Sequence, residues 1–202
     1  MSSGSLASNL LLRPVRDVYG RHVGRVINIS FNSSGDMTAI QVEQGSEDIA
    51  EYPTTQVSMN SDSVVLIPRW KVDAKVIQKE WSSTQRKIFA LDSLLKSGKI
   101  SHIVYESLRK QEFEAVINRL RKKREALLNG LRSRCDELIL CIDKYERSIV
   151  KIELERMVGE INDQTFKTAY DSMKSLLDSA MSEKRDIEAA LDQLARLDRS
   201  YL

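Results

Sequence analysis

The stretch LNGLRSRCDELILCIDKYERSIVKI, residues 128–152, decides how the second half of the chain folds. Its apolar side chains recur at alternating steps of three and four residues, which is the heptad spacing of a coiled-coil seam. The stretch therefore predicts a helix whose single apolar stripe packs against a partner helix. The residues of this predicted dimerisation seam are Leu128, Leu131, Cys135, Leu138, Ile142, Tyr145, Ile149 and Ile152.

Helical spacing continues on both sides of this stretch, and two glycines interrupt it. The segments Gly98-Lys99-Ile100 and Gly159-Glu160-Ile161 occur in matching contexts and form a weak internal repeat. We expect each glycine to end a helix in the left-handed conformation and each isoleucine to be buried in the turn. Ser101 and Asn162 are then the caps of the helices that follow. This pattern predicts helices over about 72–97, 101–158 and 163–199.

The helix predicted over 101–158 is long enough to require a partner along its length. At about 1.5 Å per residue it would span roughly 85 Å, whereas an average globular helix has about 11–12 residues. We therefore expect an elongated homodimer joined through the seam. The alternative is the core of a compact helical bundle, because the helix over 163–199 has its own apolar stripe and can fold back. A change of phase in the apolar spacing predicts a stutter close to Gly130.

The first part of the chain has the periodicity of β-strands. Val23, Ile27, Ile29 and Phe31 occupy alternate positions, Ile40 and Val42 repeat the pattern, and the turn-forming residues 32–36 lie between them. These residues predict a hairpin, and a further apolar run over 64–67 ends at Pro68. Several short strands within about 60 residues predict a small β-barrel, because an open sheet would leave its edges exposed. The predicted fold is α+β, with a flexible lead over 1–9, a small β-barrel domain over 10–71 and a long helical coiled-coil domain over 72–202.

Residues that usually carry catalysis or bind metals are sparse. His22 and His102 lie in different halves of the chain, with no cysteine or carboxylate at the spacing of a metal site or a catalytic triad. Cys135 and Cys141 match neither a zinc site nor a disulfide framework, which favours a reducing compartment. We expect no catalytic residue, no metal and no cofactor. No apolar run approaches the roughly 20 residues needed to cross a bilayer, so the sequence predicts a cytoplasmic protein.

Charge is distributed unevenly along the chain. Residues 99–135 carry 10 basic and 4 acidic residues, whereas residues 136–202 carry 10 basic and 15 acidic ones. One interpretation of the basic cluster is a solvated helix face that pairs with the acidic helix over 163–199. The other is a stripe that binds the phosphates of DNA or of anionic lipids, without base stacking because no aromatic residue interrupts it. The cluster is Arg119, Arg121, Lys122, Lys123 and Arg124.

Several motifs carry a family resemblance. The segments VRDVYGRHVGRV (15–26), IQVE (40–43) and LIPRWK (66–71) look like a PRC-barrel domain. The segments ALDSLLKSGKI (90–100) and YESL (105–108) are similar to the start of the helical region of the archaeal cell-division CdvA family. The resemblance covers roughly residues 10–130. It implies a protein that polymerises, lies at the mid-cell membrane and recruits ESCRT-III-like proteins of the CdvB family, and it also implies DNA-associated filaments.

The first functional hypothesis is a non-enzymatic scaffold of archaeal cell division. Its partners would be a second copy and higher polymers, CdvB-family proteins, DNA, and a membrane bound peripherally. We expect the helices to form the dimer and the β-barrel to supply the contact that turns dimers into filaments. Because the heptad pattern continues to Leu202, no separate partner-binding peptide is expected after it. The alternatives are a nucleoid-organising, nucleic-acid-binding coiled coil and a PRC-barrel adaptor of the ribosome-maturation type.

Overall fold

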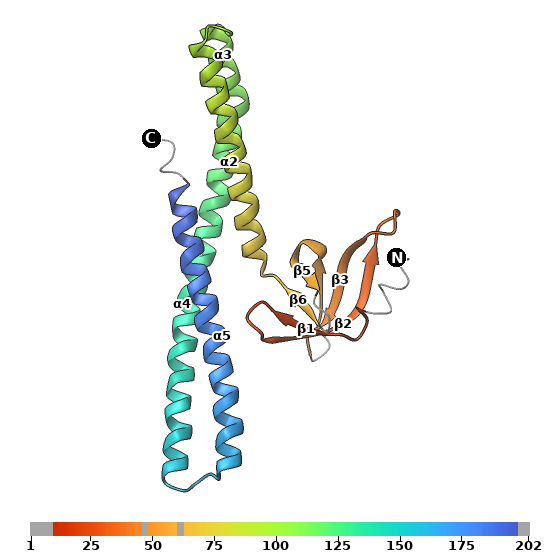
Figure 1. The fold of residues 1–202 in the computed structure, drawn as a ribbon, viewed down its shortest axis with the longest axis vertical. Helices are drawn as coiled ribbons and strands as arrows, with labels where there is room; N and C mark the ends of the chain where they lie inside the picture. The colour runs from red at the N-terminus through yellow and green to blue at the C-terminus, as the bar shows by residue number, and fades with distance from the viewer. Residues whose placement is uncertain (1–9, 46–47, 60–62, 198–202) are drawn as a thin grey trace. The chain divides into compact units, whose positions relative to one another are not determined.

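A computed structural model describes residues 10–45, 48–59 and 63–197 of the chain (Figure 1). A six-stranded β-sheet comes first and long helices follow, which confirms the predicted α+β fold. The flexible lead predicted over 1–9 and the helix end predicted at residue 199 lie outside the described residues.

The sheet consists of six short strands in the order β4-β3-β2-β1-β6-β5. β1 and β6 are parallel, and the other neighbouring strands are antiparallel. The sheet curls into a half-barrel (Figure 1), so the predicted small barrel takes the form of an open, curled sheet that ends at β4 and β5. The strands are β1 (Pro14–Asp17), β2 (His22–Phe31), β3 (Met37–Glu43), β4 (Ile49–Pro53), β5 (Val57–Met59) and β6 (Val64–Leu66), with the 3-10 turn η1 (Thr54–Gln56) between β4 and β5.

The fully buried residues in the core of the sheet are aliphatic, and Tyr52 and Met37 pack against them. These buried residues are Leu10, Val15, Val26, Ile40, Val42, Val64 and Leu66, each at most 5% exposed. Ile27, one of the apolar residues at alternate positions, is only half-buried, whereas its neighbour Val26 is fully buried. The reason is a β-bulge between Val26 and Asn28, which changes the side chains that face the core.

β2 and β3 form the hairpin predicted around residues 32–36. The Asn32 backbone N–H donates to the Asp36 carbonyl at 2.9 Å, and the Asn32 side-chain oxygen accepts from the Asp36 N–H at 2.8 Å. Gly24 lies so close to β3 that an added Cβ would be 1.9 Å from the Glu43 carbonyl oxygen. A side chain at this position would therefore separate the two strands.

The helices are α2 (Arg69–Lys96), α3 (His102–Leu108), the π-helical segment η2 (Arg109–Glu114), α4 (Ala115–Met157) and α5 (Asp163–Arg196). The helix predicted over 101–158 thus includes a π-helical stretch, which places an extra residue in a turn. Gly130, where a stutter is predicted, lies in regular α-helix. The predicted stutter concerns the phase of the apolar seam, which a regular helical backbone does not test, so it stays a prediction.

Both glycine turns have the predicted conformation. Gly98 has φ 68° and Gly159 has φ 80°. After each glycine, the next N–H donates to the carbonyl five residues earlier, at 3.0 Å in the first turn and 2.9 Å in the second, which is the bond that defines a Schellman motif. At the start of α3 the Ser101 hydroxyl accepts from the Val104 N–H at 3.3 Å. At the start of α5 the Asn162 side-chain oxygen accepts from the Thr165 N–H in the same way. The isoleucines of the two turns are half-buried, so the prediction that they are buried is only partly correct.

The chain divides into two compact units. The first contains the β-sheet together with residues 137–185, and the second contains residues 73–136 together with the chain from Asp186 onward. The division therefore cuts through α4 and α5 and does not follow the end of the sheet.

Candidate assembly site

Much of the predicted dimerisation seam is buried within one chain. Leu128, Leu131 and Leu138 are at most 4% exposed. The other seam residues, Cys135, Ile142, Tyr145, Ile149 and Ile152, are half-buried. The expectation that the seam is too long to be covered within one chain is therefore wrong for the three leucines, and a contact between copies along the seam stays a prediction.

Helix α5 folds back along α4 (Figure 1), and the unit that contains Leu128 and Leu131 also includes most of α2. At the turn between α4 and α5, Arg156 pairs with Asp163 at 3.1 Å and its guanidinium lies 4.3 Å from the centre of the Phe166 ring. The buried apolar side of α5 comprises Leu177, Ala180, Ile187, Ala190 and Leu194. This is the arrangement of the bundle alternative, in which the helix over 163–199 covers the stripe.

A second apolar strip on α4 remains exposed. Ile139 is 48% exposed and Val150 is 55% exposed, and their spacing of 11 residues puts them on the same side of the helix, three turns apart. They flank the half-buried part of the seam. The accessible apolar surface of this part of α4 is therefore this flank together with the half-buried seam residues, and not the buried leucines.

The structure separates the predicted basic cluster into exposed and buried members. Arg119, Arg121, Lys122 and Lys123 are exposed, and Arg119 lies 3.5 Å from Glu80 of α2. Arg124 is different: only 7% of it is exposed, its guanidinium lies 5.8 Å from the Trp81 ring centre, and it pairs with Glu125 at 2.9 Å. The prediction that Arg124 contributes to a phosphate-binding surface is therefore wrong, because this side chain is buried.

The acidic residues of α5 were candidates to pair with this cluster. Asp178 instead pairs with Lys174 on the same helix at 2.9 Å, and Glu183 pairs with Arg21 of the β1–β2 turn at 2.6 Å. Neither of these two pairs involves a residue of the basic cluster, and pairing between the cluster and α5 stays a prediction.

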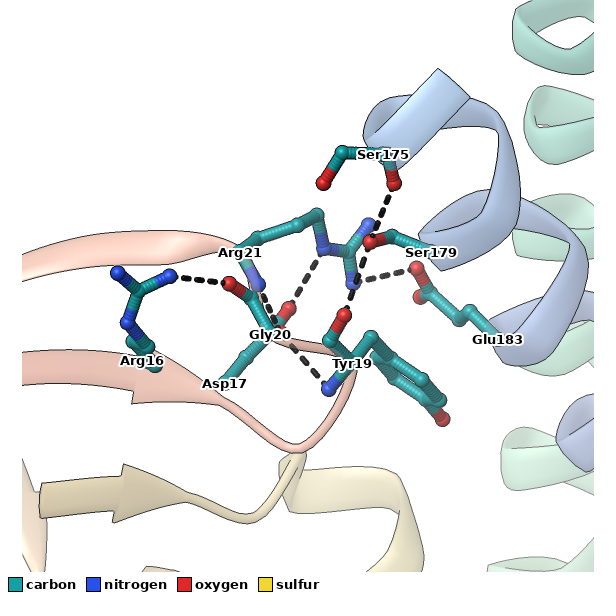
Figure 2. Close-up of polar contacts among 8 residues, drawn as sticks. All are labelled: Arg16, Asp17, Tyr19, Gly20, Arg21, Ser175, Ser179 and Glu183. Carbon is teal, nitrogen blue, oxygen red and sulfur yellow. Dashed lines mark hydrogen bonds and ion pairs between the residues drawn. The ribbon is translucent and has the colours of Figure 1, made fainter. Parts of the chain in front are cut away.

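The β1–β2 turn is held together by Asp17 (Figure 2). One carboxylate oxygen accepts from the backbone N–H groups of Tyr19 and Arg21, both at 2.9 Å, and the other accepts from the Arg21 guanidinium at 2.6 Å. Gly20 completes the turn with φ 85°, and its carbonyl accepts from Arg16 at 2.9 Å. The turn therefore presents the Arg21 side chain in a fixed position.

This turn docks on α5 through polar contacts (Figure 2). Arg21 pairs with Glu183, which is 5% exposed, and one turn earlier on α5 the Ser179 hydroxyl contacts the Tyr19 carbonyl at 2.8 Å and the Ser175 carbonyl at 2.8 Å. Burial lowers the pKa of Arg21, but hydrogen bonds to Asp17 and Glu183 outweigh it and raise that pKa above its ordinary value. We call Arg21, Tyr19, Ser179 and Glu183 the polar dock.

Comparisons with known proteins agree with this architecture. Residues 69–202 match the family described as the CdvA-like coiled-coil domain. The chain belongs to the CdvA family. Over 188 residues it is 26% identical to Cell division protein A of Sulfolobus acidocaldarius, an alignment that covers 93% of this chain and 78% of the relative. The family resemblance that the sequence motifs indicate is thereby confirmed.

In this CdvA-family chain, sequence reasoning missed the polar dock. Arg21 and Glu183 are separated by 162 positions, so no local pattern connects them. One sequence feature was informative: Ser179 and Glu183 are polar residues four positions apart, next to the apolar stripe of α5. Polar side chains at the edge of a buried face generally have a specific partner.

The residues considered for chemistry are not brought together. His22 is exposed at the start of β2, and His102 is exposed in α3, 3.9 Å from Glu106. Cys135 and Cys141 are free thiols. Within the described ranges, no three histidine, cysteine or acidic residues gather as metal ligands would. None of the helices in the described part of the chain has a stretch both long and apolar enough to span a membrane.

Proposed function

We propose that this chain is a non-enzymatic structural scaffold of cell division. Copies pair through α4, assemble into filaments at the mid-cell membrane, and help to recruit ESCRT-III-like proteins of the CdvB family. The observation that carries the proposal is the similarity to a cell-division protein over 93% of the chain, which includes both the β-sheet and the helices. The chain would act at the membrane peripherally.

The exposed flank of α4 supports pairing between copies. Burying an aliphatic side chain stabilises a contact by about 1.5–3 kcal/mol, and Ile139 and Val150 are each about half exposed in the single chain. The half-buried seam from Ile142 to Ile152 runs beside them. A second α4 placed along this flank would bury both sets of side chains.

The exposed residues allow dimerisation to be tested without unfolding the chain. Ile139→Asp/Val150→Asp should convert a dimer to a monomer in light scattering while the helical circular dichroism is unchanged, because both side chains already contact water. Leu138→Asp serves as the comparison: Leu138 is 2% exposed, so a charge there should unfold the helices themselves. Dimers of unchanged stability in the double variant would exclude pairing through this flank.

Recruitment is tested with the three components together. A CdvB-family protein should sediment with lipid vesicles only when this chain is present. In a separate experiment, the purified chain should form filaments in electron micrographs. If the CdvB-family protein binds vesicles equally well without the chain, the recruiting role is excluded.

A second candidate function is binding to DNA along the filament. The supporting observation is that Arg121, Lys122 and Lys123 are exposed on consecutive positions of α4. Such a surface can neutralise phosphates without reading bases.

A further inference from the structure

Two turns of this chain have the same local structure and opposite charge. Each is a helix end closed by a glycine in the left-handed conformation, a half-buried isoleucine and a capped helix start. We define the basic tip as residues 94–104 and the acidic tip as residues 153–163. The shared geometry means that the two tips differ mainly in the side chains that they expose.

The basic tip combines lysines with exposed aliphatic side chains. Its charged residues are Lys96 and Lys99, both exposed, and it contains no acidic residue, so its net charge is +2 with His102 neutral. Ile103 is 82% exposed and Val104 is 46% exposed. Neither side chain is in the core of its own unit.

The acidic tip combines carboxylates with another exposed apolar group. It carries four acidic residues and one arginine, a net charge of −3. Glu153 and Glu160 are exposed. Met157 is 82% exposed and Val158 is 68% exposed, and they are adjacent at the end of α4.

Single exposed hydrophobic residues are common and need no partner. The tips differ from that background because each combines large exposed apolar residues within one turn of helix with a net charge of one sign. Apolar side chains with a polar rim are typical of protein interfaces, and rims of opposite charge attract while rims of like charge repel. The basic tip is therefore suited to the acidic tip and not to a second basic tip.

We propose that the basic tip of one copy binds the acidic tip of the next copy. The aliphatic side chains of Ile103 and Val104 pack against Met157 and Val158, and the lysines meet the glutamates around them. Because the contact joins two different surfaces, it can repeat from copy to copy without closing, as an isologous dimer contact cannot. This inference rests on the proposed filament and identifies the contact that lengthens it.

Charge reversal tests the contact in the full chain. Lys96→Glu/Lys99→Glu gives a chain with two acidic tips, and Glu153→Lys/Glu160→Lys gives a chain with two basic tips. Each variant alone should raise the critical concentration for assembly about tenfold or more in a sedimentation assay at low salt, because attraction becomes repulsion. A mixture of the two variants, and a chain that carries all four substitutions, should assemble again.

Lys75→Glu/Lys79→Glu is the matched control, because it makes the same change of charge on exposed positions of α2 outside the tip. Circular dichroism and thermal melting verify that every variant is folded. If the wild type forms filaments and both reversed variants do so equally well, the tip contact is wrong while the scaffold function remains. If the wild type forms no filaments, the proposed function fails. The mixture of the two reversed variants then tests the tip contact by analytical ultracentrifugation. Association only on mixing supports the contact, and no association excludes it.

Discussion

At the scale of single residues, the polar dock is the contact that sequence reasoning could not foresee. Glu183 is almost fully buried and Arg21 is its partner at 2.6 Å. Removing one partner of a buried pair leaves an uncompensated charge, which costs about 3–5 kcal/mol. Since about 29% of the Arg21 side chain is exposed, we expect Arg21→Ala to lower the free energy of unfolding by roughly 1–3 kcal/mol in urea denaturation.

The control for this prediction lies on the same helix. Lys174 pairs with Asp178 at 2.9 Å, but both side chains are about half exposed, so Lys174→Ala should change stability much less than Arg21→Ala does. Arg21→Ala/Glu183→Ala should recover part of the loss, because the buried Glu183 carboxylate is then absent and only Asp17 still loses its Arg21 contact. Equal effects of Arg21→Ala and Lys174→Ala would show that the dock contributes no more than a surface pair.

The substitutions Gly24→Ala and Gly130→Ala are expected to change the stability of the chain in opposite directions. At Gly24 the new Cβ would lie 1.9 Å from the Glu43 carbonyl oxygen, so β2 and β3 must move apart and Gly24→Ala should destabilise the chain by about 1–3 kcal/mol. At Gly130 nothing lies within 4 Å of the added Cβ, and the residue is in the interior of α4. Gly130→Ala should therefore stabilise the chain by about 0.5–1 kcal/mol. Thermal melts of the two variants check both signs.

At the scale of elements, the helix start after the second glycine turn offers a graded test. The Asn162 side-chain oxygen accepts from the Thr165 N–H at 2.8 Å, whereas the corresponding Ser101 bond is 3.3 Å long. Asn162→Ala should cost about 1 kcal/mol because it removes the cap of α5, and Ser101→Ala should cost less. The melting temperatures of the two variants report the difference, and a larger loss for Ser101→Ala would contradict it.

The elements also show what sequence can and cannot predict. Gly98 and Gly159 were placed correctly because a Schellman turn is local: its glycine, its cap and its bonds fall within a few residues. The β2 bulge was missed because it depends on how Val26 and Asn28 meet β3, which alternation along one strand does not encode. The burial of Arg124 was missed for a similar reason, since it depends on Trp81 in a different helix.

The exposed basic residues of α4 make a separate prediction about DNA. Arg121→Ala/Lys122→Ala/Lys123→Ala should lower affinity for duplex DNA and flatten the dependence of log K on log salt by up to about 0.9 for each lost contact. Arg124 is left unchanged because it is buried. Lys144→Ala/Arg147→Ala/Lys151→Ala removes the same number of exposed charges from the same helix and is the control. If log K for DNA depends on log salt equally in the two triple variants, the basic cluster is a solvated helix face and not a DNA-binding surface.

At the scale of the whole molecule, dimerisation and filament growth need different surfaces. A contact between two α4 flanks closes a symmetric pair, so growth requires a second interface. From the sequence we expect the β-sheet domain to supply the interface for filament growth. The proposed tip contact instead places this interface at residues 94–104 and 153–163. The two hypotheses therefore differ in which part of the chain can be removed without loss of filament assembly.

Removal of residues 1–68 decides between them, because the remaining chain keeps α4 and both tips. The part of α5 that the β1–β2 turn contacts is polar at Ser179 and Glu183, so water can replace the contacts of the polar dock. We expect the shortened chain to retain its helical circular dichroism and to assemble at an unchanged critical concentration, with filaments visible by electron microscopy. A folded, dimeric product that forms no filaments would instead assign growth to the β-sheet, and the tips would then have no part in lengthening the filament.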